Sequence, residues 1–202
     1  MRQLALGITP PPQPSLDNFV PGANAELLQR VRELAAGRLA EPVLYVWGGP
    51  GSGRSHLLAA LERAAPAVHV ADDVHRLDEP RQIELFHAIN RAREAGGRVL
   101  AAGDAPPAQL ALRADLRSRL GWGLVYRLQA LSDEERAAFL GAEAARRGLR
   151  VGEDVIRYLL ARARRDLPSL MGILDALDRV SLERQRAVTL ALVREVLQLS
   201  DE

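Results

Sequence analysis

The amino-acid sequence predicts an α/β fold, in which a reduced parallel sheet of about four strands precedes a small all-α unit. The first observation is an apolar run at residues 43–47 that breaks into a glycine-rich turn and opens directly into a helical pattern. The second is that further strand-like runs alternate with helical patterns as far as residue 128. Such alternation is typical of βαβ units. After residue 131 only helical patterns remain.

The composition is that of an ordinary globular protein. The 202 residues, 48% of them hydrophobic, are enough for one α/β domain with a helical appendage. Acidic and basic residues are interleaved and the formal net charge is +1, so no blanket attraction to nucleic acid is expected. Cysteine is absent, which excludes thiolate metal sites, and the four histidines lack metal-ligand spacing. No apolar stretch has the length of a membrane span, so we expect a cytoplasmic protein with no membrane partner.

Residues 1–15 are expected to form a flexible tail, because residues 10–14 are rich in proline. Gln3, Leu4 and Leu6 nevertheless give the tail an apolar start, which is typical of a peptide that docks in an apolar groove. A plain disordered tail is the alternative.

A compact turn at residues 16–22 leads into the first helix. Asn24 is the expected cap of this helix. Its apolar face is predicted to carry Leu27, Leu28, Val31 and Leu34.

The glycine-rich turn after residues 43–47 has the spacing of the Walker A motif, a phosphate-binding loop. Glycines let the backbone approach phosphates and adopt positive φ, and the following helix N-terminus adds partial positive charge. Arg54 stands where this motif usually has lysine; since all 27 basic residues are arginine, general drift toward arginine is one explanation. An ordinary strand–turn–helix is the alternative. The expected nucleotide-binding residues here are Gly48, Pro50, Gly51, Ser52, Gly53, Arg54 and Ser55.

A second strand is expected at residues 67–71, and it ends in the paired carboxylates Asp72 and Asp73. An apolar strand with this ending, soon after a phosphate loop, is typical of the Walker B motif. Ser55 and Asp72 would then hold Mg²⁺, and Asp73 would polarise an attacking water. A simple turn at the end of the strand is the alternative.

Residues 80–94 predict a helix that ends at Gly96, and residues 99–102 predict a third strand. Asp104 follows at the carboxyl end of that strand, the edge where open parallel sheets bind ligands. It is therefore a candidate sensor of the nucleotide, with a plain turn residue as the alternative.

The remaining chain predicts an arginine-rich helix at residues 110–120 and a fourth strand at residues 122–128. Ser132 and Glu135 form a capping box at the start of the helical unit. Its four expected helices are residues 133–147, 153–164, 167–180 and 190–199. The sequence thus divides into a tail (1–15), an α/β domain (16–130) and a helical lid (131–202).

With these motifs in this order, the chain resembles the AAA+ family, and within it DnaA and its shorter relative Hda, the regulatory inactivator of DnaA. Phe19 and Val20 lie in a segment similar to the lining of the adenine pocket, and His56 lies in a loop similar to that of Hda. Arg119 takes the arginine-finger place of the Box VII segment. The stretches that carry the resemblance are residues 3–6, 16–20, 51–58, 103–107 and 115–123.

Three departures from the family pattern change what the resemblance implies. The interval from loop to Walker B is short, so a strand–helix unit is missing and the 67–71 strand should lie at the sheet edge. Pro168 stands where the lid usually has the sensor 2 arginine; Arg164 and Arg165 are alternatives. No helix-turn-helix domain follows the lid, so we expect no direct sequence-specific DNA binding.

The resemblance implies a regulator of replication initiation that binds ADP or ATP with Mg²⁺. Arg54 and Pro168 imply weak hydrolysis by the protein alone. Arg119 would instead act in trans on the nucleotide of the partner, DnaA. Gln3, Leu4 and Leu6 would bind the DNA polymerase sliding clamp (beta subunit). The alternatives are an autonomous ATPase, such as a clamp- or helicase-loading motor, and a nucleotide-free adaptor. Homodimer formation through the exposed edge strand is a further expectation.

Overall fold

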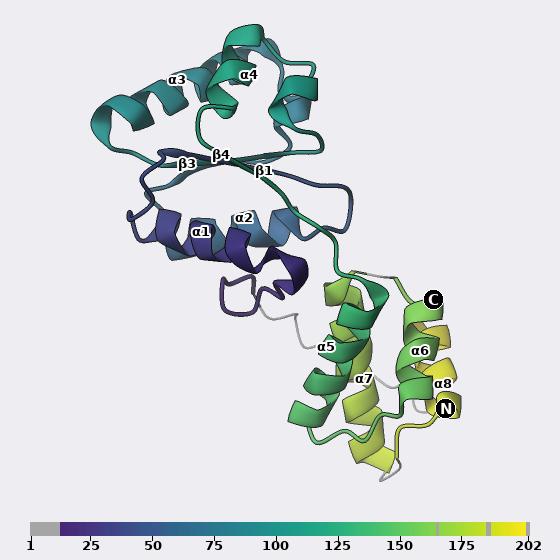
Figure 1. Cartoon of the computed structure of the whole chain (residues 1–202). Helices are drawn as coiled ribbons and strands as arrows, with labels where there is room; N and C mark the ends of the chain where they lie inside the picture. Colours follow the sequence, from purple (N-terminus) through teal and green to yellow (C-terminus); the bar gives the residue numbers. More distant parts are fainter. Residues whose placement is uncertain (1–12, 165, 185–186, 201–202) are drawn as a thin grey trace. The chain divides into compact units, whose positions relative to one another are not determined.

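The computed structural model describes residues 13–164, 166–184 and 187–200. The chain divides into two compact units (Figure 1). One consists of residues 13–130, and the other contains the described residues after Ala130. The sequence-predicted clamp-binding residues Gln3, Leu4 and Leu6 lie outside the described residues.

A four-stranded parallel sheet forms the centre of the first unit. Its strands are β1 (Val43–Trp47), β2 (His69–Ala71), β3 (Val99–Gly103) and β4 (Leu124–Arg127), in the order β2-β3-β1-β4. The reduced sheet and the edge position of the strand that precedes the paired carboxylates are both confirmed.

Helices cover both faces of the sheet (Figure 1). Side chains of α1 (Ala25–Ala35) and α2 (Arg54–Ala64) pack with Leu44 and Val46 on one face. Side chains of α3 (Glu79–Ala95) and α4 (Ala114–Leu120) pack with Val43 and Tyr45 on the other. Successive residues of β1 point to opposite faces, so its unbroken apolar run serves two cores at once.

The predicted helix at residues 110–120 is wrong in its first turn. The structure has a short 3₁₀ turn at Pro107–Gln109, and α4 begins only at Ala114. Leu110 and Leu112 lie in a bend before α4 and are buried in the core of the α3 face. Packing of these two side chains therefore overrides the local helical pattern.

The second unit is built from α5 (Asp133–Arg146), α6 (Glu153–Arg162), α7 (Leu167–Arg184) and α8 (Leu190–Ser200). Ser132 and Glu135 form the predicted capping box at the start of α5. The helices enclose a separate apolar core that includes Leu140, Leu177 and Val193. The four predicted helices are thus confirmed.

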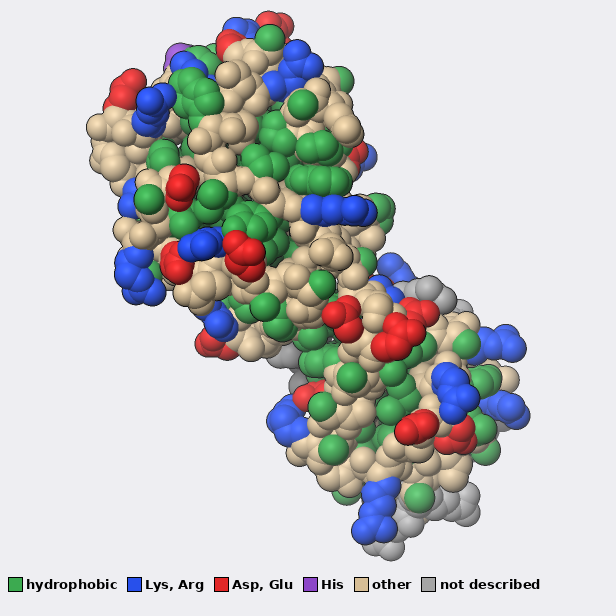
Figure 2. Space-filling model, in the orientation of Figure 1, with side chains coloured by type: hydrophobic (Ala, Val, Ile, Leu, Met, Phe, Trp, Pro, Cys, Tyr) green, Lys and Arg blue, Asp and Glu red, His purple; other side chains and the backbone are tan. Residues whose placement is uncertain are grey.

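The visible surface carries interspersed basic and acidic side chains on both units (Figure 2). This is consistent with the near-zero net charge. Within the described part of the chain, no helix has the length and apolarity needed to cross a membrane.

Candidate nucleotide-binding site

The glycine-rich loop joins β1 to α2 over the carboxyl edge of the sheet. Gly48 N–H donates to the carbonyl oxygen of Gly103 at 3.2 Å, which ties the loop to β3. A Cβ on Gly48 would lie 2.5 Å from the carbonyl oxygen of Leu128, so only glycine fits there. Gly51 and Gly53 have φ of +74° and +95°, which favours glycine. The loop therefore needs its glycines for backbone geometry, as a phosphate cradle does.

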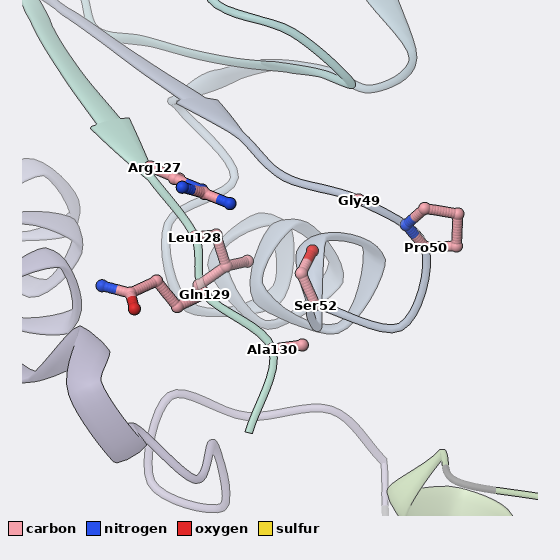
Figure 3. A pocket seen from close by; sticks show the side chains of 7 residues that line it. All are labelled: Gly49, Pro50, Ser52, Arg127, Leu128, Gln129 and Ala130. Atoms are coloured by element: carbon pink, nitrogen blue, oxygen red, sulfur yellow. The ribbon is translucent and has the colours of Figure 1, made fainter. Parts of the chain in front are cut away.

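A cavity of about 350 Å³ opens between this loop and the chain that leaves β4 (Figure 3). We call it the loop cavity; its lining residues are Gly49, Pro50, Ser52, Arg127, Leu128, Gln129 and Ala130. Ser52 is only 8% exposed, and its Oγ has no hydrogen-bond partner in the described structure. A buried hydroxyl without a partner, on the wall of a cavity, is suited to bonding a polar ligand.

Ser55 and Asp72 lie together at the predicted magnesium position. Ser55 Oγ donates to Asp72 Oδ2 at 3.3 Å, across the gap between α2 and the end of β2. Among the described residues, no group of three or more side chains could hold a metal by itself. Mg²⁺ in phosphate loops takes few protein ligands and fills its shell with water and phosphate oxygens, so one hydroxyl and one carboxylate fit this ion.

Arg54 and Asp73 form an ion pair, with Nη2 of Arg54 3.2 Å from Oδ1 of Asp73. The Arg54 side chain is 15% exposed, and its Nη1 is buried without a partner. Asp73 adopts the left-handed conformation with φ of +46°. The guanidinium is thus engaged by the acid that was predicted to polarise water, and one of its nitrogens is left for another acceptor.

Asp104 lies at the same edge, immediately after β3, and faces His75. The Nδ1 atom of His75 is 3.6 Å from Asp104 Oδ1 and 4.0 Å from Asp73 Oδ1. The Tyr45 hydroxyl donates to the carbonyl oxygen of Ala105 at 2.8 Å, and burial, reinforced by the charge of Asp104, raises the pKa of Tyr45. Sequence reasoning missed His75; its place two residues after the carboxylate pair was the available signal.

The segment before α1, which the resemblance assigns to the adenine pocket, packs against the loop through Phe19. A Cβ on Gly53 would lie 3.3 Å from the Phe19 ring, and that ring lies 5.7 Å from the His56 ring. The Nε2 atom of His56 is 3.0 Å from Asn18 Oδ1. Val20 lies half-buried in the same segment. His56 therefore fixes this segment to the first turn of α2.

Asn24 does not cap α1 with its side chain, which corrects the prediction. It is buried, and its Nδ2 donates to the Gln129 carbonyl oxygen at 2.9 Å, while its Oδ1 accepts from Gln129 N–H at 2.8 Å. These two hydrogen bonds to the backbone of Gln129 use both the donor and the acceptor of the buried amide, whereas capping the helix would use only the acceptor. It also fixes one wall of the loop cavity.

Arg119 is held away from the loop, on the α3 side of the sheet. Its Nε donates to Asn90 Oδ1 at 2.9 Å, and its guanidinium lies 3.4 Å from the centre of the Trp122 ring and 5.3 Å from that of Phe86. The side chain is half-buried, and no carboxylate in the described part of the chain pairs with it. Asn90 was not recognised from sequence, because its contact with Arg119 joins two helices, α3 and α4.

Comparison with known proteins identifies both units. Residues 133–197 match the family model of the Hda lid domain, and residues 64–127 match that of the bacterial DnaA ATPase domain. The loop at residues 48–55 precedes the second match, so its assignment depends on the motif and geometry above.

Solved structures give the same fold. Domain III of DnaA from Thermotoga maritima matches with a TM-score of 0.71 at 21% identity, covering 93% of this chain and 96% of that one. AMPPCP-bound DnaA from Aquifex aeolicus gives 0.69 at 23% identity, with 88% and 70% covered. A RuvB variant from Thermotoga maritima gives 0.64 at 16% identity, with 95% and 73% covered.

These likenesses lie below 25% identity and show the fold, whereas the two family matches show the kinship of each unit. The loop and the strand-end carboxylates agree with that kinship, whereas the sheet of only four strands is the expected departure from the family pattern. Residues 64–127 are therefore similar to the bacterial DnaA ATPase domain and residues 133–197 to the Hda lid domain, which is consistent with an Hda-like AAA+ protein.

Proposed function

We propose that this DnaA-related replication regulator binds ADP, or ATP, in the loop between β1 and α2, and stimulates ATP hydrolysis by DnaA while bound to the sliding clamp. The product would be ADP-bound, inactive DnaA. The observation that carries the proposal is the arrangement of Arg119. An arginine finger must bring an uncompensated charge to another protein's phosphates.

Arg119 meets that requirement in two ways. Its Nε is fixed by Asn90, and the Trp122 ring supports the guanidinium face, so the group is held in place before a partner arrives. Its positive charge is not neutralised by a carboxylate of the described chain. Trp122 is itself 44% exposed, so the cluster lies at the surface where a partner can reach it.

The protein's own hydrolysis should be weak. Arg54 lies where a lysine normally follows the terminal phosphate, and it is paired with Asp73. Pro168 lies in the first turn of α7, where it cannot donate a hydrogen bond. Both features favour retention of a diphosphate over turnover.

The decisive experiment measures ATP hydrolysis by DnaA with DNA-loaded clamp, comparing wild type with Arg119→Ala. We expect wild type to stimulate and the variant to lose about a hundredfold or more of that stimulation, because a finger in trans contributes roughly 10³–10⁵-fold. Arg117→Ala, on the same helix, is the matched control and should stimulate normally. Equal stimulation by both alanine variants and wild type contradicts the assignment of Arg119 as an arginine finger.

Clamp binding is tested separately with Gln3→Ala and with the double change Leu4→Ala and Leu6→Ala. Both variants should lose clamp binding by surface plasmon resonance and keep ADP binding, because the tail precedes the nucleotide unit in sequence. Unchanged clamp affinity contradicts a role of these residues.

Two simple measurements would identify the alternative functions, an autonomous ATPase and a nucleotide-free adaptor. Brisk ATP turnover by the protein alone would identify an autonomous motor. Absence of binding heat with ADP and Mg²⁺ would identify a nucleotide-free adaptor; where wild type gives heat, Arg54→Ala should abolish it.

A homodimer through the edge strand β2 is a further proposal. The strand is three residues long, and its outer edge pairs with no other described strand. Light scattering after size exclusion tests it, and a monomer at high concentration contradicts it.

A further inference from the structure

We infer that Arg127 binds a phosphate group of the nucleotide from the β4 side of the loop cavity, a role that no Walker or sensor motif assigns to it. The inference rests on the proposed nucleotide binding. It begins from a shortage of positive charge at the site. Arg54 is paired with Asp73, and Pro168 replaces the expected lid arginine.

Arg127 is the last residue of β4 and lies in register with Trp47, the last residue of β1. Its guanidinium carbon is 5.3 Å from the centre of the Trp47 ring. Figure 3 shows the side chain extending from β4 in the direction of the turn at Gly49 and Pro50. The sheet register thus places a cation beside the loop.

The charge of Arg127 is uncompensated. No carboxylate in the described part of the chain pairs with it, and none of the residues that line the loop cavity is acidic. By contrast, the carboxylates of the site follow the neighbouring strands β2 and β3, at Asp72, Asp73 and Asp104. The β4 side of the loop is therefore the side that attracts an anion.

The contact with Trp47 leaves this arginine able to donate. A guanidinium that contacts a ring uses its face, whereas its N–H groups lie in its plane and remain free for the two-pronged recognition of phosphate oxygens. Arg127 is exposed, and its contact with Trp47 favours this position of the side chain, so less entropy is lost when a phosphate binds. Trp47 is thus a support for Arg127.

The opposite wall of the cavity offers a second donor. The Ser52 hydroxyl is more than nine-tenths buried, has no partner in the described structure, and points into the same space (Figure 3). The chain between the two is joined to the end of β1, because Leu128 N–H donates to the Trp47 carbonyl oxygen at 2.7 Å. A cation and an unpaired hydroxyl on facing walls fit an oxygen-rich anion.

The test measures affinities for ADP, inorganic pyrophosphate and adenosine by competition against a fluorescent ADP analogue. Arg127→Ala should weaken ADP and pyrophosphate by the same factor, about tenfold to a hundredfold, and leave adenosine unchanged. Arg127→Lys should recover part of the loss. Arg63→Ala removes an exposed arginine at the far end of α2 and serves as the matched control; it should bind as wild type does.

Each other result overturns the inference. Wild-type affinity in Arg127→Ala removes Arg127 from the site while leaving nucleotide binding intact. A loss for ADP without a loss for pyrophosphate assigns Arg127 to the nucleoside. An equal loss of affinity in Arg63→Ala would show that the change in net charge, and not the position of Arg127, lowers the affinity. Failure of wild type to bind any of the three probes overturns the inference together with the nucleotide part of the proposed function.

Discussion

Replacement of Asp73 by asparagine should tighten ADP binding, although Asp73 lies at the site. The change removes the carboxylate that pairs with Arg54 at 3.2 Å. Asparagine tolerates the left-handed conformation found at this position, so the backbone need not move. The guanidinium of Arg54, no longer paired with a carboxylate, can then bind the phosphate oxygens of ADP.

The expected gain follows from the geometry of the pair. Two unit charges at 3.2 Å attract by about 5 kcal/mol at an effective dielectric constant of 20. The Asp73 side chain is 42% exposed, and solvent screening with the entropy of holding both side chains reduces the net contribution to about 1 kcal/mol. ADP should therefore bind about fivefold more tightly.

Isothermal titration calorimetry at fixed ionic strength provides the assay. Asp104→Asn is the matched control, because it removes one carboxylate from the same sheet edge but does not contact Arg54 in the described structure. Affinity that stays equal or falls in Asp73→Asn would refute the argument. An equal gain in Asp104→Asn would show that net charge, and not release of Arg54, is responsible.

Two further predictions concern stability. Gly123→Ala should lower the free energy of unfolding by about 3 kcal/mol or more, since its Cβ would lie 1.9 Å from the Val43 carbonyl oxygen. Gly121→Ala, whose nearest contacts are at 3.6 Å, is the control, and equal urea midpoints for the two would contradict the prediction. In the lid, hydrogen bonds from Arg146 and then Arg147 lower the pKa of Glu143 from 4.5 to about 2. This depressed pKa stabilises the fold above pH 4.5, and the contribution is lost as the pH falls toward 2. The difference between these two pKa values corresponds to about 3 kcal/mol of folding free energy, and screening at the exposed Arg146 reduces it to about 1–2 kcal/mol. Denaturant titrations at several pH values should show this loss of stability in wild type but not in Glu143→Gln.

Local spacing was enough to predict the backbone geometry of the loop. Gly48, Gly53 and Ser55 are separated by only a few residues. The two glycines are required there because the backbone geometry at each excludes a larger side chain. The carboxylates after β2 were predictable for a similar reason, because a short apolar run fixes where a buried strand ends. The lid helices follow from apolar periodicity and a capping box.

The sequence by itself determined the order of the elements, the glycine-rich loop and the acids at the strand ends, since each is encoded by neighbours in the chain. Only the tertiary structure decided which polar groups from distant parts of the chain lie together. Asn24 and Gln129 are joined across 105 positions, Arg119 reaches Asn90 on another helix, and Arg127 is brought beside the loop by sheet register. Such pairings depend on how whole elements pack, and packing is a property of buried surfaces that no local pattern specifies.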